Sequence, residues 1–148
     1  MKSKIHLLLA AALVTFGLQS CDGDDFANVS PEMRSTFSTM YPDVRYVEWD
    51  IEGGYYVAEF LDGGHEKSAW FTRDGQWYMT ETELFGRELP DPVKRAITNS
   101  EYANLHIDDA DYVETADGSV YYRIEMEKYA SRDTILKIRP DGTILGPS

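Results

Sequence analysis

Residues 55–80 read YYVAEFLDGGHEKSAWFTRDGQWYMT, and this stretch decides the fold. Its runs of aromatic and β-branched residues are typical of strands, and the Asp-Gly joints between them are typical of tight hairpins. Another such run, from Tyr46 to Glu52, precedes it and ends at Gly53-Gly54. The segment therefore predicts four successive antiparallel strands, over 46–52, 55–61, 66–72 and 76–80.

Two helices are expected beside these strands. The first has Ser30 as a favourable N-cap and Pro31 at its first position, and its apolar residues recur at helical spacing: Met33, Phe37 and Met40. The second opens at Pro92 and carries its apolar residues along one side: Val93, Ala96 and Ile97. Each helix would precede a set of four strands.

The chain also carries an internal repeat, because Tyr46-Val47-Glu48 returns sixty-six positions later as Tyr112-Val113-Glu114. Further matches stand in corresponding places: Tyr55-Tyr56 with Tyr121-Tyr122, Glu59 with Glu125, Asp74-Gly75 with Asp141-Gly142, and Ser30-Pro31 with Leu89-Pro90. A unit of about 60 residues is at the lower limit of what folds alone. We therefore expect two units, over about 29–82 and 88–148, to share one sheet. The predicted class is α+β, a duplicated helix-plus-four-strand unit with its helices on one face of an antiparallel sheet.

Side chains alternate across a strand, so each strand divides into two faces. One set is expected to form the core beneath the helices: Tyr56, Ala58, Phe60, Ala69, Phe71, Tyr122, Ile124, Met126, Leu136 and Ile138. The other set should line an open face: Tyr55, Val57, Glu59, Ser68, Trp70, Thr72, Tyr121, Arg123, Glu125, Glu127, Lys137 and Arg139. Amphipathic rings mixed with charges are typical of protein-binding patches. Tyr55, Trp70 and Tyr121 are therefore candidate protein-binding residues; alternatively, they only pair across strands and stabilise the sheet.

The first residues predict export. Lys2 and Lys4 precede an apolar run too short to span a bilayer permanently, so residues 1–20 are interpreted as a signal peptide. Leu18-Gln19-Ser20-Cys21 resembles a bacterial lipobox, which makes Cys21, the only cysteine of the chain, the predicted lipidation site. An ordinary secretory signal with a chance cysteine is the alternative.

Residues 21–28 are expected to form an acidic tether behind the lipid. Asp22-Gly23-Asp24-Asp25 resembles the tract that directs some Gram-negative lipoproteins to the outer face of the outer membrane, but a solvated tether explains it equally well. The predicted location is therefore the outer membrane, with the domain facing either the periplasm or the cell surface.

The charge of the chain excludes some partners. Lys and Arg number 14 and Asp and Glu number 26, so the formal net charge is -12. Such a chain should bind neither nucleic acid nor anionic lipid headgroups. Attachment to a membrane would then depend on the lipid at Cys21.

Catalytic, cofactor and metal motifs are not apparent. No nucleophile stands with a positioned histidine, and no phosphate loop, dinucleotide fingerprint or zinc-protease motif occurs. Asp108, Asp109 and Asp111 could offer oxygen ligands to calcium, but the spacing of a calcium loop is missing, and a solvated turn is the expected explanation. We therefore predict no enzyme, no cofactor and no metal site.

The lipobox, the duplicated unit, the paired tyrosines and the Asp-Gly hairpins together resemble the PepSY-like, β-lactamase-inhibitor-protein-like (BLIP-like) family of small secreted bacterial lipoproteins. The resemblance covers the chain from about Phe26 onward. It implies an eight-stranded antiparallel sheet with helices on one face and an open face on the other. It implies no established activity and transfers no inhibitory residue to this chain.

Two functions remain open at this stage. The first is a non-enzymatic, lipid-anchored envelope protein that binds an envelope or extracellular protein through its open sheet face. The alternative is a surface lipoprotein that binds a small ligand or a glycan, in which the same rings would stack on sugars.

Overall fold

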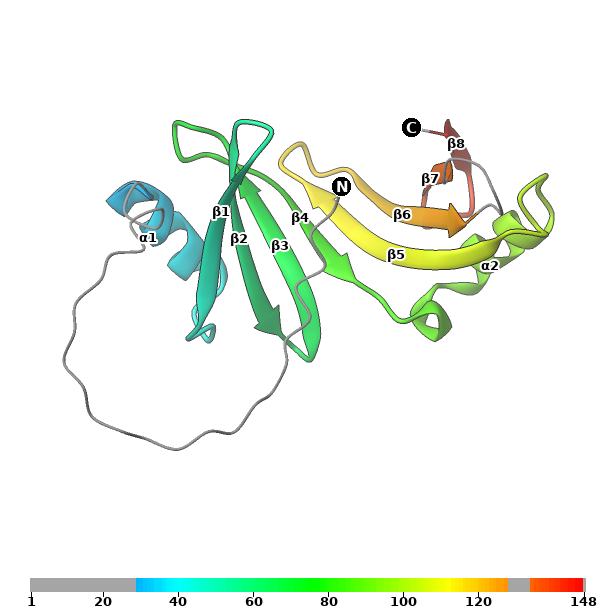
Figure 1. Cartoon of the computed structure of the whole chain (residues 1–148), viewed down its shortest axis with the longest axis horizontal. Coiled ribbons are helices and arrows are strands. Elements are labelled where there is room, and N and C mark those ends of the chain that lie inside the picture. Colours follow the sequence, from blue (N-terminus) through cyan, green and yellow to red (C-terminus); the bar gives the residue numbers. More distant parts are fainter. Residues whose placement is uncertain (1–28, 128–133, 148) are drawn as a thin grey trace.

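The computed structural model describes residues 29–127 and 134–147 (Figure 1). In these ranges the chain forms an eight-stranded antiparallel sheet in which each strand pairs with the next one along the sequence. This confirms the predicted fold class and the predicted sheet. The strands are β1 (Val47–Glu52), β2 (Tyr55–Asp62), β3 (His65–Phe71), β4 (Trp77–Glu83), β5 (His106–Thr115), β6 (Val120–Glu127), β7 (Thr134–Ile138) and β8 (Ile144–Pro147).

Helices precede each set of four strands. α1 (Pro31–Met40) begins at Ser30, whose side-chain oxygen accepts a hydrogen bond from the backbone N–H of Met33 at 3.1 Å, as expected for an N-cap. A short 3-10 helix, η2 (Gly86–Glu88), and α2 (Asp91–Thr98) connect β4 to β5. Pro92 occupies the second position of α2, close to the predicted start.

Each helix covers its own cluster of buried side chains. Under α1 the cluster is rich in aromatic rings: Phe37, Trp49, Phe60 and Phe71 pack around Met33 and the small residues Ala58 and Ala69. Under α2 the cluster is almost wholly aliphatic: Val93, Ile97, Ile124, Met126, Leu136 and Ile138. Most of the predicted core is therefore buried as expected, while Tyr56 is only partly buried.

Both helices lie on the same face of the sheet. Ala69, which packs under α1, pairs with Thr80, and Thr80 pairs with Glu114, so these three residues share one face of the sheet. On β5 the next residues of that face are Tyr112 and Ala110, which pack under α2. Figure 1 shows that the sheet bends between β4 and β5, with α1 outside one arm and α2 outside the other. The bend therefore encloses the face that carries no helix, which we call the open face.

The register corrects one part of the predicted repeat. Trp49 lies opposite Ala58, whereas Ala110 lies opposite the equivalent residue Ile124. The counterpart of Trp49 is therefore Ala110, and the match of Tyr46-Val47-Glu48 with Tyr112-Val113-Glu114 is wrong. The reason is the longer β5–β6 hairpin, in which Glu114 pairs with Val120, whereas Glu52 pairs with Tyr55 in the β1–β2 hairpin. The Tyr55-Tyr56 match with Tyr121-Tyr122 does join equivalent positions, since Tyr56 pairs with Phe71 and Tyr122 with Ile138.

The predicted match between the two helix starts is also wrong by one residue. Val29 and Leu89 are the buried residues that stand just before the N-caps Ser30 and Pro90. Leu89-Pro90 therefore corresponds to Val29-Ser30 and not to Ser30-Pro31. Proline occurs at both helix starts, but at different helical positions. An alignment of the two units on proline is therefore shifted by one residue.

Candidate functional site

The three candidate binding residues all project from the open face. Tyr55 of β2 and Trp70 of β3 are in edge contact, with ring centroids 6.1 Å apart. Tyr121 of β6 belongs to the same face, because it pairs with Val113, which in turn pairs with Glu81. The structure thus brings Tyr55 and Trp70 together and places Tyr121 on the other arm of the bend.

A fourth ring, Tyr78, joins this group and was missed by the sequence analysis. Its ring stacks on Tyr55 with centroids 5.0 Å apart and an interplanar angle of 26°, and 43% of Tyr78 is exposed. A β-bulge explains its position, because Trp70 pairs with Met79 while the next residue, Phe71, pairs with Trp77. Simple alternation along β4 cannot place Tyr78, and nothing in the composition of the strand marks the bulge.

Tyr121 lies between acidic and basic neighbours. Burial raises the pKa of its hydroxyl, and the charge of Glu81 and the hydroxyl of Tyr78 raise it further. The Lys137 ammonium lies over the Tyr121 ring, 5.1 Å from its centroid. Tyr78 and Glu81 are therefore close enough to Tyr121 to raise the pKa of its hydroxyl, so the rings of the two arms lie near one another. We call Tyr55, Trp70, Tyr78 and Tyr121 the aromatic cluster.

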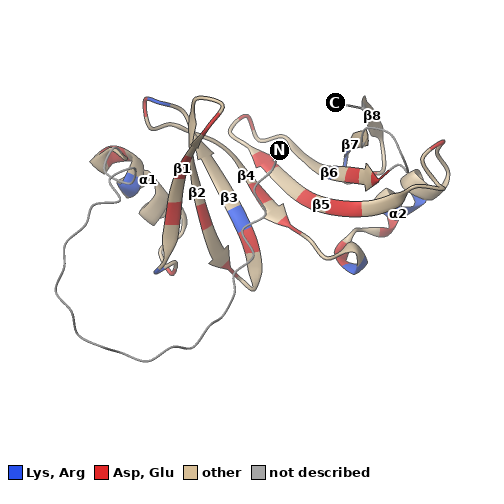
Figure 2. Cartoon of the chain, viewed as in Figure 1, with Lys and Arg blue, Asp and Glu red and all other residues tan. Residues whose placement is uncertain are grey.

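Carboxylates flank the aromatic cluster. The Trp70 indole N–H donates a hydrogen bond to Glu81 Oε2 at 3.1 Å, which fixes the Trp70 ring beside an anionic group. Figure 2 shows acidic residues along β1 to β6. By the pairing register, those of the open face are Glu48, Asp50, Glu52, Glu59, Glu66, Glu81, Glu83, Asp109, Asp111, Glu125 and Glu127.

Glu59 shows the effect of this crowding. It lies directly opposite Glu48 on β1, and Ser68 links it across β3 to Glu81 on β4. Partial burial raises the pKa of the Glu59 carboxyl, and the charges of Glu52, Asp50, Glu48 and Glu66 raise it further. Like charges directly opposite each other destabilise a sheet. We call Glu48, Glu59 and Glu81 the acidic row.

The carboxylates of β5 and β6 differ from the acidic row because a guanidinium group contacts them. Arg123 Nη1 donates to Asp111 Oδ2 at 2.5 Å, and Arg123 Nη2 lies 3.9 Å from Glu125 Oε2. Asp111 is 7% exposed, and burial, followed by the charges of Asp109 and Glu81, raises its pKa to about 6 despite the attraction of Arg123. Here a partly buried guanidinium neutralises part of the acidic surface.

Val57 departs from the sequence prediction. It projects to the open face, as expected, but it is buried, with 2% of its surface exposed, and Val113 on β5 is fully buried on the same face. Val57 lies opposite Asp50 on one side and Trp70 on the other. These two buried side chains give the open face an apolar floor.

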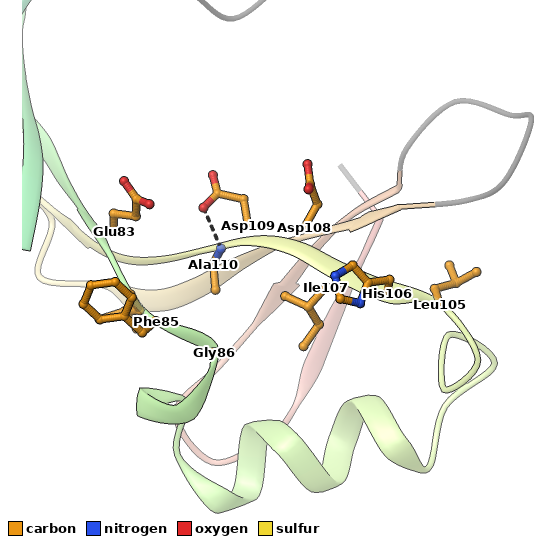
Figure 3. A pocket seen from close by; sticks show the side chains of 10 residues that line it. Glu83, Phe85, Gly86, Leu105, His106, Ile107, Asp108, Asp109 and Ala110 are labelled. Carbon is orange, nitrogen blue, oxygen red and sulfur yellow. Dashed lines mark hydrogen bonds between the residues drawn. The ribbon is translucent and has the colours of Figure 1, made fainter. Parts of the chain in front are cut away.

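A shallow hollow lies where β4 leaves the sheet toward η2. Its walls include Glu83, Phe85, His106, Asp108 and Asp109. In Figure 3, Glu83, Asp108 and Asp109 point to one side of β5, away from α2, and the dashed line marks the 2.9 Å hydrogen bond from the Ala110 N–H to Asp109 Oδ1. The predicted solvated turn at Asp108, Asp109 and Asp111 is wrong, because these residues lie within β5.

The remaining features concern metal ligands, membrane-spanning helices and the lipid anchor. Within the described ranges, no group of three or more His, Cys, Asp or Glu side chains is arranged to hold a metal ion. No helix in the described part of the chain is long and apolar enough to cross a membrane. Cys21 and the acidic tract at 22–25 lie outside the described residues, so the lipid anchor stays a prediction.

Solved structures share this architecture. A DUF2874 family protein from Bacteroides ovatus is 32% identical and superposes with a TM-score of 0.75, covering 80% of this chain and 85% of that one. A BLIP-like protein from Bacteroides fragilis is 29% identical, with a TM-score of 0.73 over 84% of this chain and 91% of that one. A protein from Bacteroides eggerthii described as "putative periplasmic" is 24% identical, with a TM-score of 0.74 over 80% and 87%, and shows the fold alone.

Sequence comparison agrees with the structural likeness. No protein of curated function matches the chain. The profile of the family described as "Putative beta-lactamase-inhibitor-like, PepSY-like" matches residues 54–146, which is most of the two-helix, eight-strand domain. The chain therefore belongs to the PepSY-like, beta-lactamase-inhibitor-like family.

Proposed function

We propose that this chain is a non-enzymatic, lipid-anchored protein of the cell envelope that binds another protein through the open face of its sheet. The observation that carries the proposal is the aromatic cluster. Stacked and edge-on rings of Tyr55, Trp70 and Tyr78 project from the sheet face opposite α1 and α2, which no helix within residues 29–127 and 134–147 covers. Tyrosine and tryptophan are the residues most enriched at the centres of protein interfaces.

The shape of the face supports a protein partner. Tyr55 and Tyr78 stack on each other, so each ring has one of its faces already occupied. The bend of the sheet surrounds the cluster on two sides, and Val57 and Val113 give it an apolar floor. A convex protein element would bury these rings together, and clustered rings in a desolvated pocket are typical of interface hot spots.

The envelope location has separate support. Residues 1–21 have the order of a lipoprotein signal, and a structural neighbour is described as a "putative periplasmic" protein. The proposed location is the outer membrane, with the domain facing the periplasm or the cell surface. Cys21→Ser should release the protein from the membrane fraction; a variant that stays in that fraction would contradict lipid anchoring at Cys21.

Cross-linked capture from intact cell envelopes tests the binding function. The wild-type chain should capture a protein that the variant Tyr55→Ala, Trp70→Ala, Tyr121→Ala loses, while the circular dichroism of the two proteins agrees. A matched control, Tyr46→Ala with Phe85→Ala, removes two exposed rings outside the aromatic cluster, 88% and 56% exposed, and should capture the same protein. Equal capture by all three proteins would refute the proposal.

A further inference from the structure

We infer that the partner presents lysine or arginine side chains to the open face, and that the aromatic cluster and the acidic row receive these cationic groups together. The inference rests on the proposed function and names the chemistry of the partner. It follows from three features of the open face: the acidic charge of β1 to β4, the rings beside carboxylates, and the contact between one ring and a cation of the chain itself.

The first feature is the sign of the charge. In the described strands β1 to β4, the charged side chains that the register places on the open face are all carboxylates, from Glu48 to Glu83. The lysine of these strands, Lys67, lies on the other face, where it contacts the Tyr41 ring at 5.8 Å and Asp62 at 2.7 Å. The described strands of this arm thus place carboxylates and no lysine or arginine on the open face, and only Glu81 among the acidic row is also near a cation, Arg123 of β6.

The second feature is the energetic effect of that charge on the fold. Glu48 and Glu59 are opposite each other, and the charges that raise the pKa of Glu59 all come from carboxylates. Like charges directly opposite each other destabilise a sheet. Folding gains nothing from this arrangement, whereas a cationic partner would relieve the repulsion on binding.

The third feature is the placement of rings next to the acidic row. Trp70 donates its indole hydrogen bond to Glu81, so an electron-rich ring and a carboxylate stand side by side. A lysine ammonium or an arginine guanidinium is attracted to the face of such a ring, most strongly where water is excluded. A neighbouring carboxylate then adds a charge-assisted hydrogen bond.

The chain itself contains an example of this contact. Lys137 reaches across from β7 and places its ammonium 5.1 Å from the centroid of Tyr121, a member of the aromatic cluster. Arg123 likewise forms ion pairs with the carboxylates of Asp111 and Glu125. On β5 to β7 cations of the chain therefore contact the ring and the carboxylates, whereas on β1 and β2 Glu48 and Glu59 lie opposite each other, and their attraction for a cation is left for a partner.

The test compares two triple variants of equal charge change in the full-length chain, purified in a nonionic detergent. The first neutralises the acidic row: Glu48→Gln, Glu59→Gln, Glu81→Gln. The control neutralises exposed acids away from the open face: Glu32→Gln, Asp43→Asn, Glu101→Gln. The probe is a short fluorescent peptide that alternates lysine with threonine, and a second peptide has glutamate in place of lysine. Circular dichroism establishes that all three proteins are folded.

The wild type and the control should bind the lysine peptide equally, and the acidic-row variant should bind it at least tenfold more weakly, which corresponds to about 1.4 kcal/mol. The glutamate peptide should not bind. Equal loss in both variants would show attraction by net charge alone and would overturn the inference, as would equal binding by all three proteins.

The same proteins separate this inference from the proposed function. In envelope capture, a partner lost by the aromatic variant and by the acidic-row variant supports both. A partner lost by the aromatic variant but retained by the acidic-row variant leaves the binding function in place and overturns the cationic partner. Retention by both variants overturns the binding function itself.

Discussion

The two arms of the sheet have the same architecture but unlike open faces. β1–β4 and β5–β8 each pack one helix against a buried cluster, and both turn at matching Asp-Gly hairpins. On β5–β7 the open face supplies Arg123 and Lys137 to its own carboxylate and ring. On β1–β4 it combines the rings of Tyr55, Trp70 and Tyr78 with carboxylates, and these described strands place no lysine or arginine on that face. Since the fold needs only the shared features, this difference favours the first arm as the centre of the proposed binding surface.

The largest effect should come from the shared feature, the core. Phe71 and Ile138 are equivalent and fully buried residues of the two clusters. Phe71→Ala should lower the free energy of unfolding by about 3–5 kcal/mol and Ile138→Ala by about 2–5 kcal/mol, through lost burial and the cavity left behind.

Urea titration followed by two probes shows whether the arms unfold together. All three tryptophans lie in the first arm, at positions 49, 70 and 77, so their fluorescence reports that arm, while circular dichroism reports the whole sheet. A continuous sheet predicts that Ile138→Ala shifts both midpoints equally. A shift in circular dichroism alone would mean that the arms are independent.

The next effect concerns Asp111 on the second arm. Its pKa in the folded chain is raised to about 6 from an ordinary value of 3.8, so the folded state holds this proton more tightly than the unfolded state does. The contribution of Asp111 to stability is therefore largest at low pH and falls as the pH rises from about 4 to about 6, by at most about 3 kcal/mol. Asp111→Asn should flatten this part of the pH profile of unfolding, whereas Asp43→Asn in an exposed turn should leave it unchanged. An unchanged slope in Asp111→Asn would contradict the assignment.

The Asp-Gly hairpins give a smaller and more direct comparison. Gly75 has φ +83° and Gly142 has φ +90°, so alanine is strained at both, by about 1–3 kcal/mol. At Gly142 a Cβ atom would also lie 2.7 Å from the carbonyl oxygen of Pro92 in α2, while at Gly75 the nearest atoms, in Met33 of α1, are 3.8 Å away. Thermal unfolding should therefore show a greater loss for Gly142→Ala than for Gly75→Ala. Equal losses would mean that the hairpin of the second arm shifts away from α2 without penalty.

The smallest effect distinguishes the two open faces directly. Glu59→Gln should raise the free energy of unfolding by up to about 1 kcal/mol, because it removes a carboxylate that lies opposite Glu48 and is repelled by the neighbouring carboxylates. Glu125→Gln on the second arm should not stabilise the fold, because Glu125 lies 3.9 Å from Arg123. Equal stabilisation by both changes would show that the two faces do not differ in this way.

Much of this fold could be predicted from local patterns. Alternation in β3, β6 and β7 identified the buried residues correctly, and in β2 it identified Ala58 and Phe60 but not Val57. The hairpins and the Ser30 cap depend on residues close in sequence. Alternation also placed Tyr55, Trp70 and Tyr121 on one face.

The remaining features depend on pairing between distant residues. The bulge that turns Tyr78 outward is set by how β4 pairs with β3, and the true counterpart of Trp49 is set by the length of the β5–β6 hairpin. The burial of Val57 depends on its cross-strand neighbours, Asp50 and Trp70. Neither the register nor the bend leaves a mark in the local sequence, so these features needed the structure.

The most direct test of the binding surface uses the three indole N–H resonances in an NMR titration with the lysine–threonine peptide. Trp70 projects from the open face, whereas Trp49 and Trp77 pack in the cluster under α1 and serve as internal controls. We predict that the Trp70 resonance moves saturably while those of Trp49 and Trp77 stay in place. A Trp70 resonance that does not move at peptide concentrations that saturate binding, or one that moves no more than the other two, would contradict a binding surface on the first arm.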